Sequence, residues 1–141
     1  MLRPPVSDPD EEGSILLLTL GYAMLAIVAI LVCVNATSLY LAQKRLDSLA
    51  DAAALAGADG FSIGMSGGEP HAELRDDAVF TQASEIVDAV GDGAILVSAG
   101  TPDGLSARVS VATVWQAPIV SLFVPEGVRL ASTATSRTAL R

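Results

Sequence analysis

A long run without charge constrains this chain more than any other feature of its sequence. No Asp, Glu, Lys or Arg occurs between Gly13 and Gln43, and residues 15–34 are apolar apart from Thr19, Gly21 and Tyr22. About 20 apolar residues, each rising 1.5 Å along a helix, span the hydrocarbon layer of a bilayer. Because backbone groups in lipid must hydrogen-bond within the chain, the run predicts a single transmembrane helix.

A buried helix of a soluble protein and a cleaved secretory signal are the alternatives for this run. Burying so long an apolar helix would need a larger core than a chain of 141 residues can build around it. A secretory signal opens with basic residues and has a short apolar region, whereas four acids precede this longer run. They are Asp8, Asp10, Glu11 and Glu12.

The helical pattern continues beyond the apolar run. Small and apolar residues recur there at steps of three and four, which is the spacing of one face of a helix. They are Leu39, Ala42, Leu46, Leu49, Ala53 and Ala56. A face made largely of alanine permits close approach of another element. We therefore predict a transmembrane and extended helix over residues 14–58.

The other segments complete an α+β organisation. Residues 1–13 are rich in proline and acids and predict a disordered acidic tail. Five glycines between Gly57 and Gly68 predict a glycine-rich linker over residues 59–71. Residues 72–141 are then expected to form a small domain, with an amphipathic helix over 72–90.

Alternating residues predict about three antiparallel strands after that helix. Residues 94–99 and 105–115 flank the turn sequence Thr101-Pro102-Asp103-Gly104, so they are expected to form a hairpin. In the second strand Ala107, Val109, Val111 and Thr113 alternate with Arg108, Ser110, Ala112 and Val114, and we expect one of the two faces to be buried. Residues 128–140 predict the last strand, and residues 119–124 form an apolar stretch of no assigned structure.

The composition offers little chemistry. A net charge of -8 argues against nucleic-acid binding, which needs clustered Lys and Arg. Cys33 is the only cysteine, so neither an internal disulfide nor a multi-thiolate zinc site can form. His71 is the only histidine and is expected to be a solvated loop residue rather than a base or metal ligand. We predict no enzyme activity, no cofactor, no metal and no small-molecule substrate.

The sequence allows two environments for the side chain of Trp115. A tryptophan at the end of a strand can pack into the core or stand exposed as an anchor for a partner, and we expect the first.

The sequence around the helix resembles a known family. After Glu12-Gly13-Ser14 and the uncharged run comes Lys44-Arg45-Leu46-Asp47-Ser48-Leu49, followed by Ala-Asp-Ala-Ala-Ala-Leu-Ala-Gly-Ala over residues 50–58. This arrangement resembles the TadE/TadG-like proteins of Tad (Flp) pilus-assembly systems. The resemblance covers about residues 11–60, and the alanine-rich segment is its most specific part.

The resemblance implies a minor pilin or pseudopilin in a bacterial cell membrane, at the pilus or cell surface, with other pilus-assembly subunits as partners. It also implies a cytoplasmic N terminus and an extracytoplasmic C-terminal domain. The positive charges on the two flanks of the apolar run do not decide the orientation, since Lys44 and Arg45 on one flank are balanced by Arg3 and the terminal amine on the other. The residues expected to form the membrane and assembly helix are Ala26, Ala29, Cys33, Leu46, Leu49, Ala53 and Ala56.

Processing by a prepilin peptidase is a separate question. Gly13 and Ser14 form the candidate cleavage site, but such leaders usually carry Glu five residues after the glycine, and here that position is Leu18. A retained N terminus therefore fits the sequence at least as well as a cleaved one.

Two functional hypotheses follow. The first is a structural component of a Tad pilus or a related secretion apparatus that assembles through its N-terminal helix. The alternative is a membrane-anchored extracytoplasmic binding module unrelated to pili.

Overall fold

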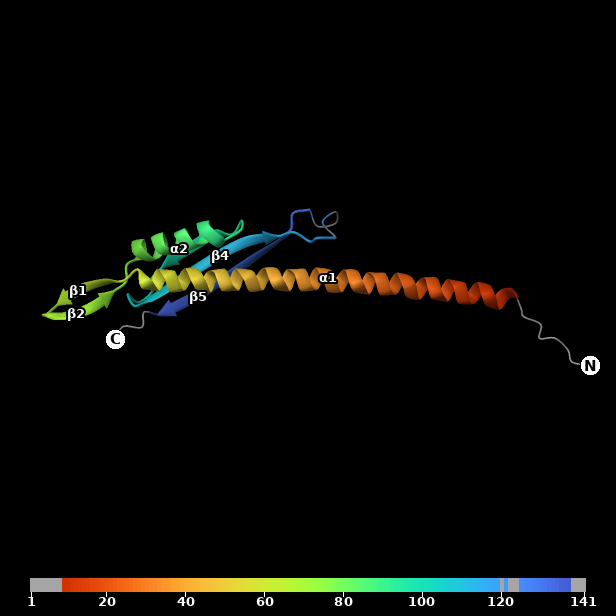
Figure 1. Cartoon of the computed structure of the whole chain (residues 1–141), viewed down its shortest axis with the longest axis horizontal. Helices are drawn as coiled ribbons and strands as arrows, with labels where there is room; N and C mark the ends of the chain where they lie inside the picture. The colour runs from red at the N-terminus through yellow and green to blue at the C-terminus, as the bar shows by residue number, and fades with distance from the viewer. Residues whose placement is uncertain (1–8, 120, 122–124, 138–141) are drawn as a thin grey trace, which may run out of the picture. The chain divides into compact units, whose positions relative to one another are not determined.

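The computed structural model describes residues 9–119, 121 and 125–137. The chain divides into two compact units, one ending at Thr37 and the other beginning at Ser38. Helix α1 (Pro9–Asp59) contributes to both, whereas every described strand belongs to the second unit. The elements after α1 are β1 (Ser62–Ser66), β2 (Glu69–Glu73), α2 (Asp76–Val90), β3 (Ile95–Gly100), β4 (Ser106–Trp115) and β5 (Val128–Arg137) (Figure 1).

Helix α1 begins earlier than its predicted start at residue 14. It starts at Pro9, so residues 9–13 are helical rather than part of a disordered tail, and residues 1–8 lie outside the described part of the chain. Proline suits the first turn of a helix, because its missing N–H would have no partner there.

An antiparallel sheet forms the framework of the second unit. Its described strands lie in the order β3-β4-β5, and β4 pairs with β5 along its whole length, from Ser106 opposite Arg137 to Trp115 opposite Val128. The pairing of β3 with β4 shifts register between Leu96 and Ser98. One face of β4 is buried, as predicted, and it is the face of Ala107, Val109 and Val111, which are fully covered.

The core lies where α1 and α2 cover this face of the sheet. Val79, Ala83 and Val87 of α2 are buried at helical spacing, and Leu74 just before the helix is buried with them. Helix α1 contributes two leucines followed by four alanines to this core: Leu46, Leu49, Ala50, Ala53, Ala54 and Ala58. The predicted small-residue face of α1 is therefore packed within the chain itself.

Gly57 marks the closest approach in this core. A Cβ atom added there would lie 2.9 Å from Val79 Cγ1 and 3.3 Å from the Cβ of Ala107. Only glycine leaves room for α1, α2 and β4 to meet at one point, which explains a residue of poor helix propensity inside the helix.

The predicted glycine-rich linker differs from the observed structure. Strands β1 and β2 form an antiparallel hairpin there, with Ser66 opposite Glu69. Gly67 and Gly68 connect them with φ angles of 63° and 89°. Two successive residues with positive φ are what a tight two-residue hairpin turn requires, so these glycines form a defined turn.

The predicted fold class is confirmed: a long N-terminal apolar helix precedes a small α+β domain with one helix and antiparallel strands. Helix α2 begins at Asp76 rather than at residue 72, because Ala72 and Glu73 pair with β1. The predicted apolar stretch 119–124 falls largely outside the described residues, as do residues 138–140 of the predicted last strand.

Candidate functional site

The apolar part of α1 is the first candidate surface. Within its unit the large side chains from Ile15 to Val34 are exposed except for that of Leu31, which is half-buried; Leu16 is 73% exposed and Val34 44%. The described residues contain one helix long and apolar enough to cross a membrane, with a mean hydropathy of 2.8 in its most apolar window. None of that window is buried within the chain. An apolar surface of this extent needs lipid or other apolar helices around it.

The polar side chains of this segment bond to the helix itself. Thr19 Oγ1 donates to the carbonyl of Ile15 at 2.8 Å, and Asn35 Nδ2 donates to the carbonyl of Leu31 at 2.8 Å. Such bonds to the preceding turn let polar side chains lie in or near lipid at reduced cost.

The predicted membrane and assembly residues fall into two groups. Ala26, Ala29 and Cys33 are exposed on the first unit, and Cys33 is a free thiol. Leu46, Leu49 and Ala53 are buried in the core of the second unit, and Ala56 is half-buried. Residues of the first group are open to contact with other chains, whereas those of the second group are already covered by their own domain.

Gly13 and Ser14, the candidate processing site, lie inside α1 rather than before it. Both are exposed, and nothing lies within 4 Å of the space that a Cβ on Gly13 would occupy.

A polar cluster fixes α1 to the edge strand β5. Asp47 Oδ1 accepts hydrogen bonds from Gln43 Nε2 at 2.9 Å and from Ser132 Oγ at 2.8 Å. Gln43 Nε2 also donates to the carbonyl of Ala131 at 3.3 Å. The bond from Gln43, then that from Ser132, lowers the pKa of Asp47 below its ordinary value. Nothing in the helical spacing of Gln43 and Asp47 indicates their partner on β5.

Asp103 organises the turn between β3 and β4. Its Oδ1 accepts from the backbone N–H groups of Leu105 and Ser106, at 3.0 and 2.6 Å, and its Oδ2 accepts from Ser106 Oγ at 2.9 Å. These bonds, that from the Leu105 amide first, lower the pKa of Asp103 from 3.8 to about 2. The turn was predicted from Pro102 and Gly104, and the carboxylate supplies its hydrogen bonds.

Trp115 lies at the end of β4 and is half-buried. Its indole Nε1 donates to Ser38 Oγ at 3.1 Å, which ties the end of the strand to the first residue of the second unit.

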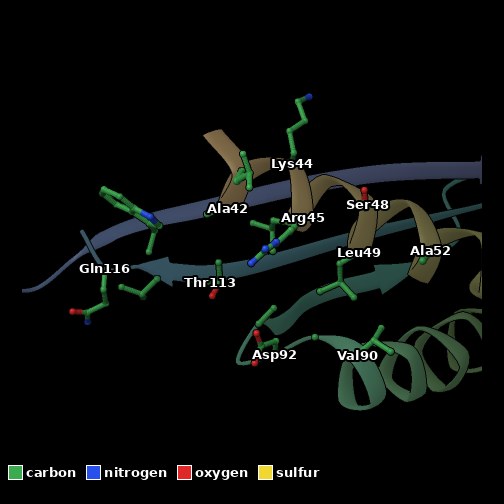
Figure 2. A pocket seen from close by; sticks show the side chains of 16 residues that line it. Ala42, Lys44, Arg45, Ser48, Leu49, Ala52, Val90, Asp92, Thr113 and Gln116 are labelled. Atoms are coloured by element: carbon green, nitrogen blue, oxygen red, sulfur yellow. The ribbon is translucent and has the colours of Figure 1, made fainter. Parts of the chain in front are cut away.

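An open groove of about 860 Å³ lies beside Trp115. It is lined by residues 41–52 of α1, by the end of α2 with the residues after it, and by residues 113–116 at the end of β4. Figure 2 shows the side chain of Arg45 directed into the groove, while that of Lys44 points away from it. We call this space the Arg45 groove.

Groups that could support catalysis or metal binding are not assembled in the part of the chain that the structure describes. Within it, no three His, Cys, Asp or Glu side chains are close enough to hold a metal ion. His71 is exposed, as expected, but it lies on β2 opposite Gly64 rather than in a loop.

The comparison with protein families bears on the helix. Residues 13–60 match the family described as Flp pilus-assembly TadE/G-like. This confirms the predicted resemblance, which covered about the same segment. The matched region covers both the exposed apolar half and the packed half of α1 and ends at Gly60, just after the helix. The family is structural rather than catalytic. No curated protein and no solved structure matches the chain.

Proposed function

We propose that this chain is a minor pilin-like or pseudopilin-like component of a Tad (Flp) pilus or a related secretion apparatus. In this role the first unit anchors the chain in the membrane as a single-pass helix. The N terminus is cytoplasmic and the α+β domain lies outside the membrane. The observation that carries the proposal is the apolar segment of α1, which has no buried residue and lies inside the region that matches the TadE/G-like family.

The two parts of α1 differ in burial, which supports a different role for each part. Leu46, Leu49 and Ala53 are covered by their own sheet and second helix, so they stabilise the domain. Ala26, Ala29 and Cys33 belong to the part without intramolecular cover, and small residues allow helices to approach closely in lipid. We therefore assign contacts with neighbouring pilus subunits to this first group.

Mass analysis of purified surface fibres and of washed membranes from the same cells tests this function. The proposal expects the chain in the fibres, or in membranes together with the other pilus-assembly subunits. The mass also reports whether the chain begins at Met1 or at Ser14. Deletion of the chain should reduce fibre number, and unchanged fibres in the deletion strain would contradict the proposal.

A membrane-anchored binding module unrelated to pili is the second candidate function. The Arg45 groove is the observation that favours it, since the groove lies in a unit with its own core. Normal pilus assembly without the chain, together with specific capture of a ligand by the domain, would support this alternative.

A further inference from the structure

Arg45 is a cation that lacks a partner in its own domain. The described part of the chain holds three ion pairs, Lys44 with Asp47, Arg75 with Asp77 and Arg137 with Asp103. Arg45 takes part in none of them, nor in any of the side-chain hydrogen bonds found among the described residues. Asp92 also lines the groove but is not within ion-pair distance of Arg45. The guanidinium therefore presents its donors to the groove, and a guanidinium fits phosphate well.

Residues that form or adjoin the groove follow the apolar run closely in the sequence. Trp115 bonds to Ser38, which is only four residues beyond Val34, the end of the apolar run. Lys44 and Arg45 are the first charged residues after the run.

The neighbouring aromatic residues are of the kind found at membrane surfaces. Tyr40 is exposed, and the ammonium group of Lys44 lies 5.8 Å from the centre of its ring. Trp115 is half-buried beside the groove. Tyrosine and tryptophan are enriched at the level of lipid headgroups, because each combines an apolar ring with a polar group.

We propose that the Arg45 groove binds the phosphate of an anionic phospholipid headgroup and so fixes the domain against the membrane surface. The inference rests on the proposed membrane anchor. Charge complementarity selects the ligand, since Arg45 is a free cation directed into the groove (Figure 2). Lys44 is one residue away but is paired with Asp47 and directed elsewhere.

The single tryptophan of the chain makes the proposal testable on the full-length protein. The chain is reconstituted in lipid nanodiscs of phosphatidylcholine with increasing fractions of phosphatidylglycerol. The emission of Trp115 is recorded, together with its quenching by brominated lipid. We expect a blue shift and stronger quenching as the anionic fraction rises. A response that does not depend on lipid charge would overturn the proposal.

Three variants separate binding in the groove from diffuse attraction. Arg45→Ala should raise the anionic fraction needed for half of the change about fivefold, because it removes the charge-assisted hydrogen bonds of the guanidinium to phosphate. Lys44→Ala removes the same charge from a side chain that points away from the groove, and it should change this midpoint less than twofold. Asp92→Asn should lower the midpoint, and asparagine tolerates the φ of 44° at this position. Equal shifts for Arg45→Ala and Lys44→Ala would contradict a site in the groove.

Two further results are distinguishable from these. If millimolar inorganic phosphate alone produces the change in phosphatidylcholine discs, the groove binds free phosphate and the proposal of a lipid ligand is wrong. If the chain does not co-elute with the discs in the absence of detergent, the proposed anchor itself fails. Incorporation is therefore measured before fluorescence.

Discussion

At the residue scale, the core of the domain requires tight packing of the small side chains of α1. Ala53 has no exposed surface and lies in the core between α1, α2 and the sheet. Ala53→Leu should lower the free energy of unfolding by about 1–3 kcal/mol, because a larger side chain overfills a close-packed site. Denaturant unfolding in mild detergent measures this. Ala52→Leu, at an exposed position one residue earlier, should change it by less than about 0.5 kcal/mol. Similar effects of both variants would show that the face is not packed.

Asp103 gives a prediction for pH. Its pKa is about 2 in the folded state and 3.8 ordinarily, so the carboxylate form binds the turn more strongly than the protonated form. The resulting stability is present above pH 3.8 and is lost as the pH falls toward 2. Asp103→Asn should lower the unfolding temperature at pH 7 and reduce the further loss between pH 4 and 2. Asp88→Asn, at an exposed site on α2, is the matched control. An unchanged pH profile in Asp103→Asn would contradict the role given to this turn.

The sequence predicted the burial of some residues of α1 but not what covers them. The spacing of Leu46, Leu49 and Ala53 predicted a packed face, and these residues are buried. The same spacing could not say whether another subunit or the chain's own sheet covers the face. The hydrogen bond between Asp47 and Ser132 could not be predicted from the sequence for a related reason. It joins residues 85 positions apart, and a helical pattern carries no information about partners so distant.

At the element scale, helix α1 carries the proposed function. Ala29 lies near the middle of the apolar run and is exposed. Ala29→Arg should prevent stable membrane insertion, because a charge near the bilayer centre costs about 2.5–3.5 kcal/mol. The measurement is the fraction of protein that stays in membranes after an alkaline carbonate wash. Asp51→Arg, an exposed position on the domain half of the same helix, should insert like the wild type. Normal insertion of Ala29→Arg would count strongly against the anchor.

The elements were predicted to different degrees. Periodicity and turn residues predicted α1, the end of α2 at Val90 and all three strands of the sheet to within a few residues. The hairpin of β1 and β2 was missed because its strands are only five residues long and contain Gly64 and Pro70, two residues that are unfavourable in strands. Glycine density indicates a flexible linker and a tight turn alike, and only the backbone angles of Gly67 and Gly68 distinguish them.

At the scale of the whole molecule, the packed half of α1 sets the boundary of the folded domain. The core contains Leu46, Leu49 and four alanines from α1, so the domain begins within the helix rather than after it. A fragment of residues 38–141 should unfold cooperatively in water. A fragment of residues 59–141 should not, because it lacks that side of the core. Circular dichroism during heating compares the two. Cooperative unfolding of the shorter fragment would show that α1 is dispensable for the domain.

The central claim is that residues 15–34 lie in a membrane and that the α+β domain lies outside it. Protease treatment of intact spheroplasts that produce the full chain tests both parts at once. The account predicts that external protease removes the domain and that a fragment containing the apolar helix stays in the washed membranes. Recovery of the whole, undigested chain in the soluble fraction would contradict it.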